Sequence, residues 1–392
     1  MLTEDRQNQI LRELALRGSL NAAEFARRLG ISGMTVRRDL AVLDEKGLLQ
    51  RVHGGAVAGT GSPRGAGKQA HGAVKHVSKE PGHAASTGGS AGSPARQRPL
   101  ATIGMIVPTA RYYFPGIIRG AETAARELGV RLVLGVSNYS AAEEQRQIQR
   151  LLKSGVDGLL VTPSGETLAE TATLELLDSA EVPVIVVERS IDGAMDAGRL
   201  ESVRSDHVLG AEIAVKHLLS LGHRKIALCV RESSPTSAPV SEGYRRAMSA
   251  AGVTQDAALE RSITLAANDP ESLRRELDSI VSSFVDGGAT AAIVHNDEDA
   301  LMFADLCEAR GLHIPENLAL VAYDDEIASF GSVPMSAVAP PKFDVGYHAV
   351  QMCLNRLGPR RLSGLALQRV ILSPTLVVRE STAPEGDGTG HQ

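Results

Sequence analysis

The sequence contains no tryptophan, and its aromatic fraction is only 3%. Its three cysteines, Cys229, Cys307 and Cys353, are widely separated and have no second cysteine or histidine at metal-ligand spacing. This spacing favours buried free thiols over a disulfide framework or a metal site. No apolar run reaches about 18 residues, and the start, MLTEDRQNQI, lacks the charged-then-apolar pattern of an export signal. We therefore predict a soluble cytoplasmic protein.

The common signatures of enzymes are also missing. The sequence has no P-loop, no H-E-x-x-H motif and no G-x-G-x-x-G motif opening its first strand-helix unit. A G-x-S-x-G pattern runs from Gly88 to Gly92, but no strand precedes it and no helix follows it, so we interpret it as a chance match. The sequence therefore predicts no enzyme, no cofactor and no metal site.

Charge is distributed unevenly along the 392 residues. Residues 1–98 contain 15 lysines and arginines against 8 acidic residues, whereas the rest of the chain contains 26 against 38. A basic module joined to an acidic one favours a polyanion-binding end, because only the basic part gains by displacing counterions from phosphates. Residues 59–98 have almost no large apolar residues and are rich in Gly, Ser, Ala and Pro, which predicts a flexible linker.

The pattern of residues 1–58 predicts three helices and a short hairpin, the arrangement of a winged helix-turn-helix. Capping residues and glycines delimit the helices at about residues 4–17, 21–30 and 32–47. In the third helix, Val36, Leu40 and Leu43 share the inward face, while Met34, Arg37 and Arg38 point mostly the other way. The segment LLQRVHGGAV alternates around Gly54 and Gly55, as the two strands of a wing do.

From Pro99 onward the sequence alternates between β-branched apolar runs and amphipathic segments of helical length. The expected strands are at residues 102–107, 130–135, 158–161, 184–187, 225–230, 291–294 and 319–322. The expected helices are at residues 116–128, 141–154, 210–221, 241–251, 272–286 and 299–310. This alternation predicts an α/β fold with two Rossmann-like lobes, in which a ligand binds beyond the carboxyl ends of parallel strands.

The amino-terminal module resembles the DeoR family of bacterial repressors. The resemblance covers about residues 5–57 and is carried by the run SGMTVRRDL from Ser32 to Leu40 and by RVHGGA from Arg51 to Ala56. It implies contact with double-stranded operator DNA by residues of the third helix and the wing, namely Ser32, Met34, Thr35, Arg37, Arg38, Arg51 and His53. Arginine is suited to this role because it bonds a guanine edge in two places or grips phosphate.

Simpler interpretations of these residues remain open. Arg37 and Arg38 also fit a solvated helix face, and His53 also fits a residue that supports the Gly-Gly turn. We interpret Asp39 as structural.

Residues 99–382 resemble the effector-binding domain of the LacI/GalR family, which shares its fold with periplasmic sugar-binding proteins. The matching segments, in chain order, are IGMIVP, VDGL, HLLSLGHRKI, HND, VAYDD and LVVREST. The resemblance implies two lobes with three crossovers, near Arg204, Val333 and Leu362. Lobe 1 is then expected at about 99–204 and 334–361 and lobe 2 at 205–333 and 362–382, with a disordered tail at 383–392.

The resemblance also implies which residues contact an effector in the cleft. Carboxylates and amides bond sugar hydroxyls, and aromatic rings cover C–H surface. The candidates are Tyr113, Phe114, Glu188, Asn296 and Asp324. The alternatives are that Asp324 and Asn296 cap helices, that Tyr113 and Phe114 pack in the core, and that Glu188 pairs with Arg189.

The sequence departs from the sensor family in two ways. Val240 stands where many members carry an arginine that clamps the ligand. The alternatives are an unusual ligand, a ligand held by another group such as Arg111, and a ligand that is not bound tightly. The expected linker replaces the family's short hinge helix. We therefore hypothesise that effector binding closes the lobes and alters the geometry of a dimer, which changes how two tethered heads span a pair of half-sites.

Together these features predict a DNA-binding transcriptional regulator, acting as a homodimer on operator DNA at the nucleoid. Its expected role is to repress a carbohydrate-utilisation operon under the control of a small sugar-like effector. The alternatives are an activator with the same architecture and a solute-binding protein of transport type, against which the missing export signal and the DNA-binding head both count.

Overall fold

The computed structural model divides the chain into two compact units, Met1–Ala91 and Gly92–Gln392. The expected linker at 59–98 and the expected tail at 383–392 lie outside the residues that the structure describes. The described residues are 10, 19–21, 25, 33–45, 49–52, 55–58, 99–165, 168–169, 171–191, 198–253, 259–264, 269–357 and 366–382.

The first unit contains the predicted third helix and the predicted wing. Helix α3 (Gly33–Glu45) precedes strands β2 (Leu49–Val52) and β3 (Gly55–Ala58), which pair antiparallel. A third strand, β1 (Ser19–Asn21), pairs with β3, giving the order β1-β3-β2 among the described residues. The sequence analysis missed β1, because three residues are too few to show an alternating pattern.

A small apolar core holds the described part of this unit together. As predicted, one face of α3 is buried, and it packs with side chains from the segments before and after it. The buried cluster consists of Ile10, Phe25, Val36, Leu40, Leu43, Leu49 and Ala56.

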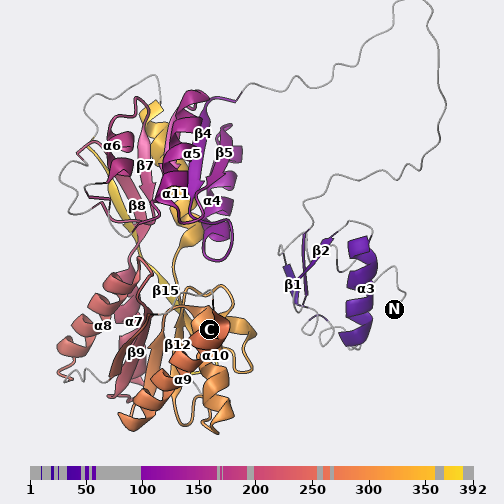
Figure 1. The fold of residues 1–392 in the computed structure, drawn as a ribbon, viewed down its shortest axis with the longest axis vertical. Helices are drawn as coiled ribbons and strands as arrows, with labels where there is room; N and C mark the ends of the chain where they lie inside the picture. The colour runs from indigo at the N-terminus through magenta and orange to yellow at the C-terminus, as the bar shows by residue number, and fades with distance from the viewer. Residues whose placement is uncertain are drawn as a thin grey trace, which may run out of the picture. The chain divides into compact units, whose positions relative to one another are not determined.

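The second unit consists of two α/β lobes, shown in Figure 1. In the described part of the first lobe, six strands form a parallel sheet in the order β14-β8-β7-β6-β4-β5. The strands are β4 (Thr102–Val107), β5 (Arg131–Val136), β6 (Gly158–Val161), β7 (Val184–Val187), β8 (Glu201–Ser205) and β14 (Arg369–Leu372). The helices are α4 (Phe114–Glu127), α5 (Ala141–Lys153), α6 (Ala172–Asp178) and α11 (Lys342–Leu357).

In the described part of the second lobe, a further six strands have the order β10-β9-β11-β12-β13-β15, and all neighbours are parallel except β13 and β15. The strands are β9 (Ile226–Arg231), β10 (Glu260–Ile263), β11 (Ala291–Val294), β12 (Ala319–Tyr323), β13 (Ser336–Ala339) and β15 (Thr375–Val377). The helices are α7 (His207–Ser220), α8 (Ser237–Ala250), α9 (Pro270–Asp286), α10 (Asp297–Ala309) and the 3₁₀ turn η2 (Ala328–Phe330).

The chain passes between the lobes three times, but two of the passages differ from those expected. The first, at Asp206, agrees with the expected position near Arg204. The second lies after β13 rather than near Val333, because β13 pairs with β12 and so belongs to the second lobe. The third lies between β14 and β15 rather than near Leu362, because β14 pairs with β8 in the first lobe. The second passage is displaced because the sequence analysis did not predict β13. The third is displaced because β14 and β8 are distant in the chain, and no local pattern reveals their pairing.

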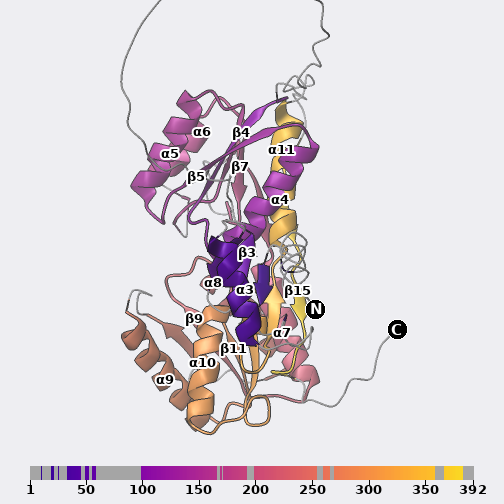
Figure 2. The same cartoon turned by 90° about the vertical axis from the view of Figure 1, so that its right-hand side faces the viewer.

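Two helices of the first lobe, α4 and α11, cross at van der Waals distance, and they lie side by side in Figures 1 and 2. Two glycines make this approach possible. A Cβ atom on Gly120 would lie 1.9 Å from the carbonyl oxygen of Phe343, and one on Gly346 would lie 1.9 Å from that of Ile117. The crossing fixes α11 against the face of the sheet, and the first residue of α11, Lys342, therefore lies at the edge that faces the second lobe.

Every cysteine is free and buried, as the spacing predicted. Burial raises the pKa of each thiol above its ordinary value. No helix in the described part of the chain is both long and apolar enough to cross a membrane.

Candidate functional site

Helix α3 has exposed side chains, among them Arg38 and Asp44, in addition to its buried stripe. Thr35 is half-buried and Asp39 is buried, as a structural residue would be. A contact with a guanine edge or a phosphate needs an exposed guanidinium, and Arg38 meets this requirement. The remaining predicted DNA contacts, which are Ser32, His53 and the side chains of Met34, Arg37 and Arg51, lie outside the described residues.

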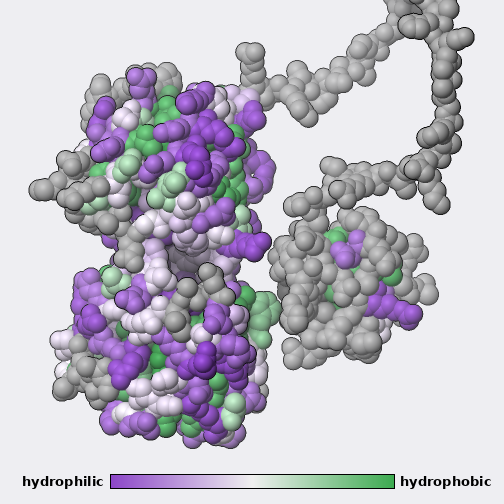
Figure 3. All heavy atoms as spheres, viewed as in Figure 1, coloured by the Kyte–Doolittle hydropathy of each residue, from purple (hydrophilic) through white to green (hydrophobic). Residues whose placement is uncertain are grey.

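In the second unit, the carboxyl ends of the parallel strands of one lobe meet those of the other. Figure 3 shows the two lobes joined at a narrower waist. Several non-glycine residues near these strand ends have a left-handed backbone, among them Tyr112 (φ 46°), Glu188 (φ 56°) and Asp324 (φ 86°). L-residues rarely adopt this conformation, and it clusters at ligand sites where the surrounding structure enforces it.

Tyr112 links the two lobes. It follows β4 in the first lobe, and its hydroxyl donates to Asp297 Oδ1 at 2.5 Å and lies 3.1 Å from Asp324 Oδ2, both in the second lobe. The other oxygen of Asp297 accepts from the backbone amides of Glu326, Ile327 and Ala328. The Tyr112 hydroxyl therefore contacts the carboxylates of both Asp297 and Asp324. Carboxylates also bond the hydroxyls of sugars.

Asp324 is buried, as a ligand-contacting carboxylate in a closed cleft would be. Burial raises the pKa of Asp324 to about 7, Lys342 opposes the shift, and the nearby Asp297 adds to it. Lys342 belongs to the first lobe, yet its ammonium group donates to the Asp324 carbonyl and lies 2.5 Å from Glu326 Oε1. Asp324 thus sits where charges from both lobes meet.

Glu188 and Tyr113 form a second polar cluster, on the first lobe. The Tyr113 hydroxyl donates to Glu188 Oε1 at 2.5 Å, and Glu188 also accepts from the amide and the hydroxyl of Ser205. Lys342 lies over the Tyr113 ring, 5.2 Å from its centre. The structure thus brings Tyr113 and Glu188 together, and among the described residues Glu188 and Arg189 form no ion pair between their side chains.

Phe114 and Asn296, two of the predicted effector contacts, show the packing and capping contacts that the sequence left open as alternatives. Phe114 is 3% exposed and packs in the core of the first lobe, so it does not provide an apolar face to the cleft. Asn296 is the N-cap of α10, and its side-chain oxygen accepts from the Asp299 amide. Val240 is a buried core residue of the second lobe.

The sequence analysis missed several buried or half-buried polar residues at the same edges. They lie at the ends of strands, in the loops that follow or at the starts of helices, namely Tyr112, Thr162, His207, Arg231, His295 and Asp297. Arg189 was considered only as a partner of Glu188. Their place in the sequence could have identified them, because the first polar residue after a buried parallel strand points into the crevice where ligands bind.

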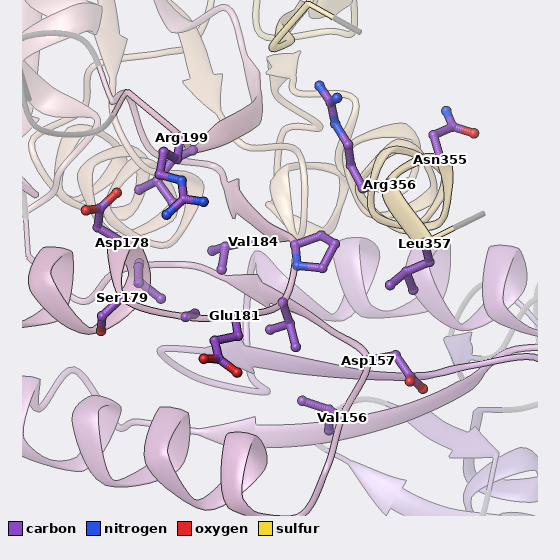
Figure 4. Close-up of a pocket in the computed structure, with 15 residues that line it drawn as sticks. Val156, Asp157, Asp178, Ser179, Glu181, Val184, Arg199, Asn355, Arg356 and Leu357 are labelled. Carbon is purple, nitrogen blue, oxygen red and sulfur yellow. The ribbon is translucent and has the colours of Figure 1, made fainter. Parts of the chain in front are cut away.

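A pocket of about 940 Å³ lies elsewhere, at the amino-terminal edge of the first-lobe sheet. Figure 4 shows Asp157, Glu181, Arg199 and Arg356 around it. It lies at the opposite end of β6 and β7 from Thr162 and Glu188, and none of the described unpartnered polar atoms lines it. We therefore place the candidate effector site between the lobes. No group of residues in the described part could hold a metal ion.

Comparison with known proteins agrees with both units. A family model for a DeoR-like helix-turn-helix domain matches residues 6–60, and one for a periplasmic binding protein-like domain matches residues 215–382. The arabinose metabolism transcriptional repressor of Geobacillus stearothermophilus is 25% identical over 92% of this chain and 90% of its own length. The HTH-type transcriptional repressor PurR of Haemophilus influenzae (strain PittEE) is 29% identical over 71% of this chain and 81% of its own length.

Solved structures show the same two-lobed fold. The transcription regulator GntR from Chromobacterium violaceum has a TM-score of 0.60 and 25% identity, covering 72% of this chain and 99% of that one. A LacI family regulator from Enterococcus faecium, solved with bound ribose, has a TM-score of 0.58 and 24% identity, covering 72% of this chain and 99% of that one.

The fold and the polar edges between the lobes define a periplasmic-binding-protein-like ligand-binding unit. The chain joins this unit to a DeoR-like helix-turn-helix domain, and its relatives are transcriptional repressors, with LacI family regulators among its structural neighbours. The relatives named here are regulators and not enzymes.

Proposed function

We propose that this protein represses a carbohydrate-utilisation operon and that a small sugar-like effector, bound between the two lobes, sets its affinity for operator DNA. The observation that carries the proposal is the meeting of Tyr112 with Asp297 and Asp324 at the facing strand ends of a chain that also has a DNA-binding head. Regulators of this kind need one site for DNA and a separate site for the signal.

The named relatives support the carbohydrate assignment. One represses arabinose metabolism, and a structural neighbour was solved with ribose. In this chain, Asp324, Glu188, Tyr113 and the amide of Asn296 are the proposed contacts to the effector's hydroxyls. A sugar hydroxyl would take the place of the Tyr112 hydroxyl on Asp324, so binding and lobe geometry are coupled.

The proposed DNA contacts are those of the third helix and the wing. Arg38 is exposed on α3 and faces the major groove or its phosphates in this proposal, together with Ser32, Met34, Thr35, Arg37, Arg51 and His53. One winged head offers a small contact area, so we propose a homodimer that binds two half-sites of a palindrome. Because a linker at 59–98 joins the units in this proposal, effector binding changes the affinity for operator DNA by changing the geometry of the dimer.

The experiment is a titration of the purified full chain onto a labelled fragment of its own upstream region at fixed salt, followed by fluorescence anisotropy. We expect specific binding that a sugar or sugar derivative weakens at least tenfold. A scrambled fragment of the same length and composition is the control. Equal affinity for the two fragments, at this and at other promoters, would overturn the assignment as a regulator.

A further inference from the structure

Polar atoms without partners are concentrated at the facing edges of the two lobes. Among the described residues, six buried side-chain nitrogen or oxygen atoms have no hydrogen-bond partner, and one of them, Gln147 Oε1, lies away from the edges beside Gly135. The other five belong to residues at or just after strand ends. They are Thr162 Oγ1, Arg189 Nε, His207 Nε2, Arg231 Nη1 and His295 Nδ1. Buried polar groups are nearly always paired in folded proteins, so this concentration indicates that a ligand supplies the partners.

Two of the five unpaired atoms, both on arginines, are hydrogen-bond donors only. An arginine nitrogen can only donate, whereas histidine and threonine can do either. Nearby carboxylates already accept hydrogen bonds from the protein: Glu188 accepts three from Tyr113 and Ser205, which leaves it little further capacity. Asp299 accepts from Arg231 Nε at 3.1 Å. The remaining hydrogen-bonding capacity of the site therefore favours a ligand rich in acceptor oxygens.

Arg189 indicates that the ligand is negatively charged. It is 8% exposed, and its only hydrogen bond to a described residue is from Nη1 to the Glu188 carbonyl, at 2.7 Å. Among the described residues it has no ion pair, whereas Arg231, on the other lobe, is paired with Asp299. Burial lowers the pKa of Arg189, and the neighbouring Glu188 carboxylate, which raises it, offsets only part of this cost. An anion that hydrogen-bonds the guanidinium removes more of the cost.

The two histidines add no positive charge of their own. Burial lowers the pKa of His295 to about 3, and the neighbouring His207 and Arg231 lower it further. Burial also lowers the pKa of His207, and Arg189 is among the groups that reinforce the shift. Burial thus disfavours the charged form of both rings. Arg231 is paired with Asp299 and Lys342 with Glu326, which leaves Arg189 as the buried cation without an ion pair among these described residues.

We propose that the effector is an anionic polyol, a sugar derivative bearing a carboxylate or phosphate group, and that Arg189 binds this group. The inference rests on the proposed function in one respect, that the effector binds between the lobes. Arg231 Nη1 supplies a further donor from the second lobe. The hydroxyls of the same molecule are left to Asp324 and Asn296.

The first experiment is a thermal unfolding series of the full chain with matched neutral and acidic probes. The pairs are D-glucose with D-gluconate and D-glucose 6-phosphate, D-galactose with D-galacturonate, and D-ribose with D-ribose 5-phosphate, all at one ionic strength. We expect an acidic member to raise Tm while its neutral parent does not, because only a bound ligand stabilises the folded state. The carboxylate and phosphate members distinguish the two sources of charge.

The second experiment compares variants by calorimetric titration with the best acidic probe. Arg189→Gln should weaken its binding at least tenfold, and Arg189→Lys less, because the lysine keeps the charge but not the planar fork. Arg146→Gln, at an arginine whose side chain is 67% exposed on α5, is the matched control and should leave the affinity unchanged. A neutral parent that binds within threefold of its acid would overturn the proposal, as would an equal loss for both probes in Arg189→Gln.

A ligand-free measurement decides the case in which no probe binds. If Arg189 is an uncompensated charge, Arg189→Met should raise the Tm of the ligand-free chain by about 2 °C or more. A lower Tm in this variant would show that Arg189 is a structural residue and would overturn the proposal. Operator binding is measured separately, so failure of the anion proposal is distinguishable from failure of the regulator assignment.

Discussion

The Tyr112 hydroxyl of the first lobe donates a 2.5 Å hydrogen bond to Asp297 at the start of α10 in the second lobe. The same hydroxyl lies 3.1 Å from Asp324, so one side chain connects the lobes at two carboxylates. The backbone of Tyr112 is left-handed at φ 46°, which indicates that the loop after β4 is held in place for this contact.

Replacing this hydroxyl should loosen the connection between the lobes. Tyr112→Phe removes both hydrogen bonds, and we expect a loss of about 1–3 kcal/mol in unfolding free energy and a larger radius of gyration without ligand. Denaturant unfolding and small-angle scattering measure these changes. Tyr347→Phe is the matched control, because it removes a bond to Glu127 within the first lobe. Identical scattering from Tyr112→Phe and wild type would contradict a role in holding the lobes together.

Asp324 should make stability depend on pH. Because its folded pKa of about 7 is above the usual value for an unfolded aspartate, roughly 3.9, its contribution is fully present below about pH 4 and is lost as the pH rises to about 7. Asp324→Asn cannot ionise, so its stability relative to wild type should increase by roughly 1.4 kcal/mol per pH unit across that window. Urea unfolding of both proteins at pH 4.5, 6 and 7.5 tests this. A difference that stays constant across the three pH values would show that Asp324 ionises normally.

The crossing of α4 and α11 should not tolerate a side chain at Gly346. A Cβ there would lie 1.9 Å from the Ile117 carbonyl oxygen, so the helices must separate and the core loses contacts. We expect Gly346→Ala to lower the unfolding free energy by about 3 kcal/mol. Gly198→Ala is the control, since no atom of the described residues lies within 4 Å of the added methyl group. Thermal unfolding of the two variants should differ clearly, and equal Tm values would contradict this packing.

Arg38 should contribute to operator affinity through its charge. If it contacts a phosphate, Arg38→Ala should weaken binding to specific and scrambled fragments alike and reduce the salt dependence by about one counterion. If it reads a guanine, the specific fragment should lose about 1–3 kcal/mol more than the scrambled one. Anisotropy titrations at several salt concentrations separate the two. Arg146→Ala is the control, and unchanged binding by Arg38→Ala would remove Arg38 from the interface.

Elements with a strong local pattern were predictable. The strands at 102–107, 158–161, 184–187 and 291–294 agree with the structure, because runs of buried β-branched residues mark central parallel strands. Helices α7 and α10 begin two or three residues before the expected start. Their first turns contain the polar residues His207 and Asp297, so the spacing of apolar residues does not show where these helices begin. The predicted site residues Tyr113, Glu188 and Asp324 lie at the facing edges, whereas Phe114 does not.

The sequence alone determined the class of each unit, because helix caps, glycine stops and alternating strand-helix runs are local features that neighbouring residues specify. It also determined where polar residues follow strands. Tertiary structure decided the lobe crossovers, since they follow from the pairing of β13 with β12 and of β14 with β8, and the second of these pairs joins segments far apart in the chain. It also decided which polar atoms have hydrogen-bond partners. Only the folded chain places the Tyr112 hydroxyl on Asp297 and leaves Arg189 buried without an ion pair among the described residues, because both depend on groups that the backbone brings together from separate strands.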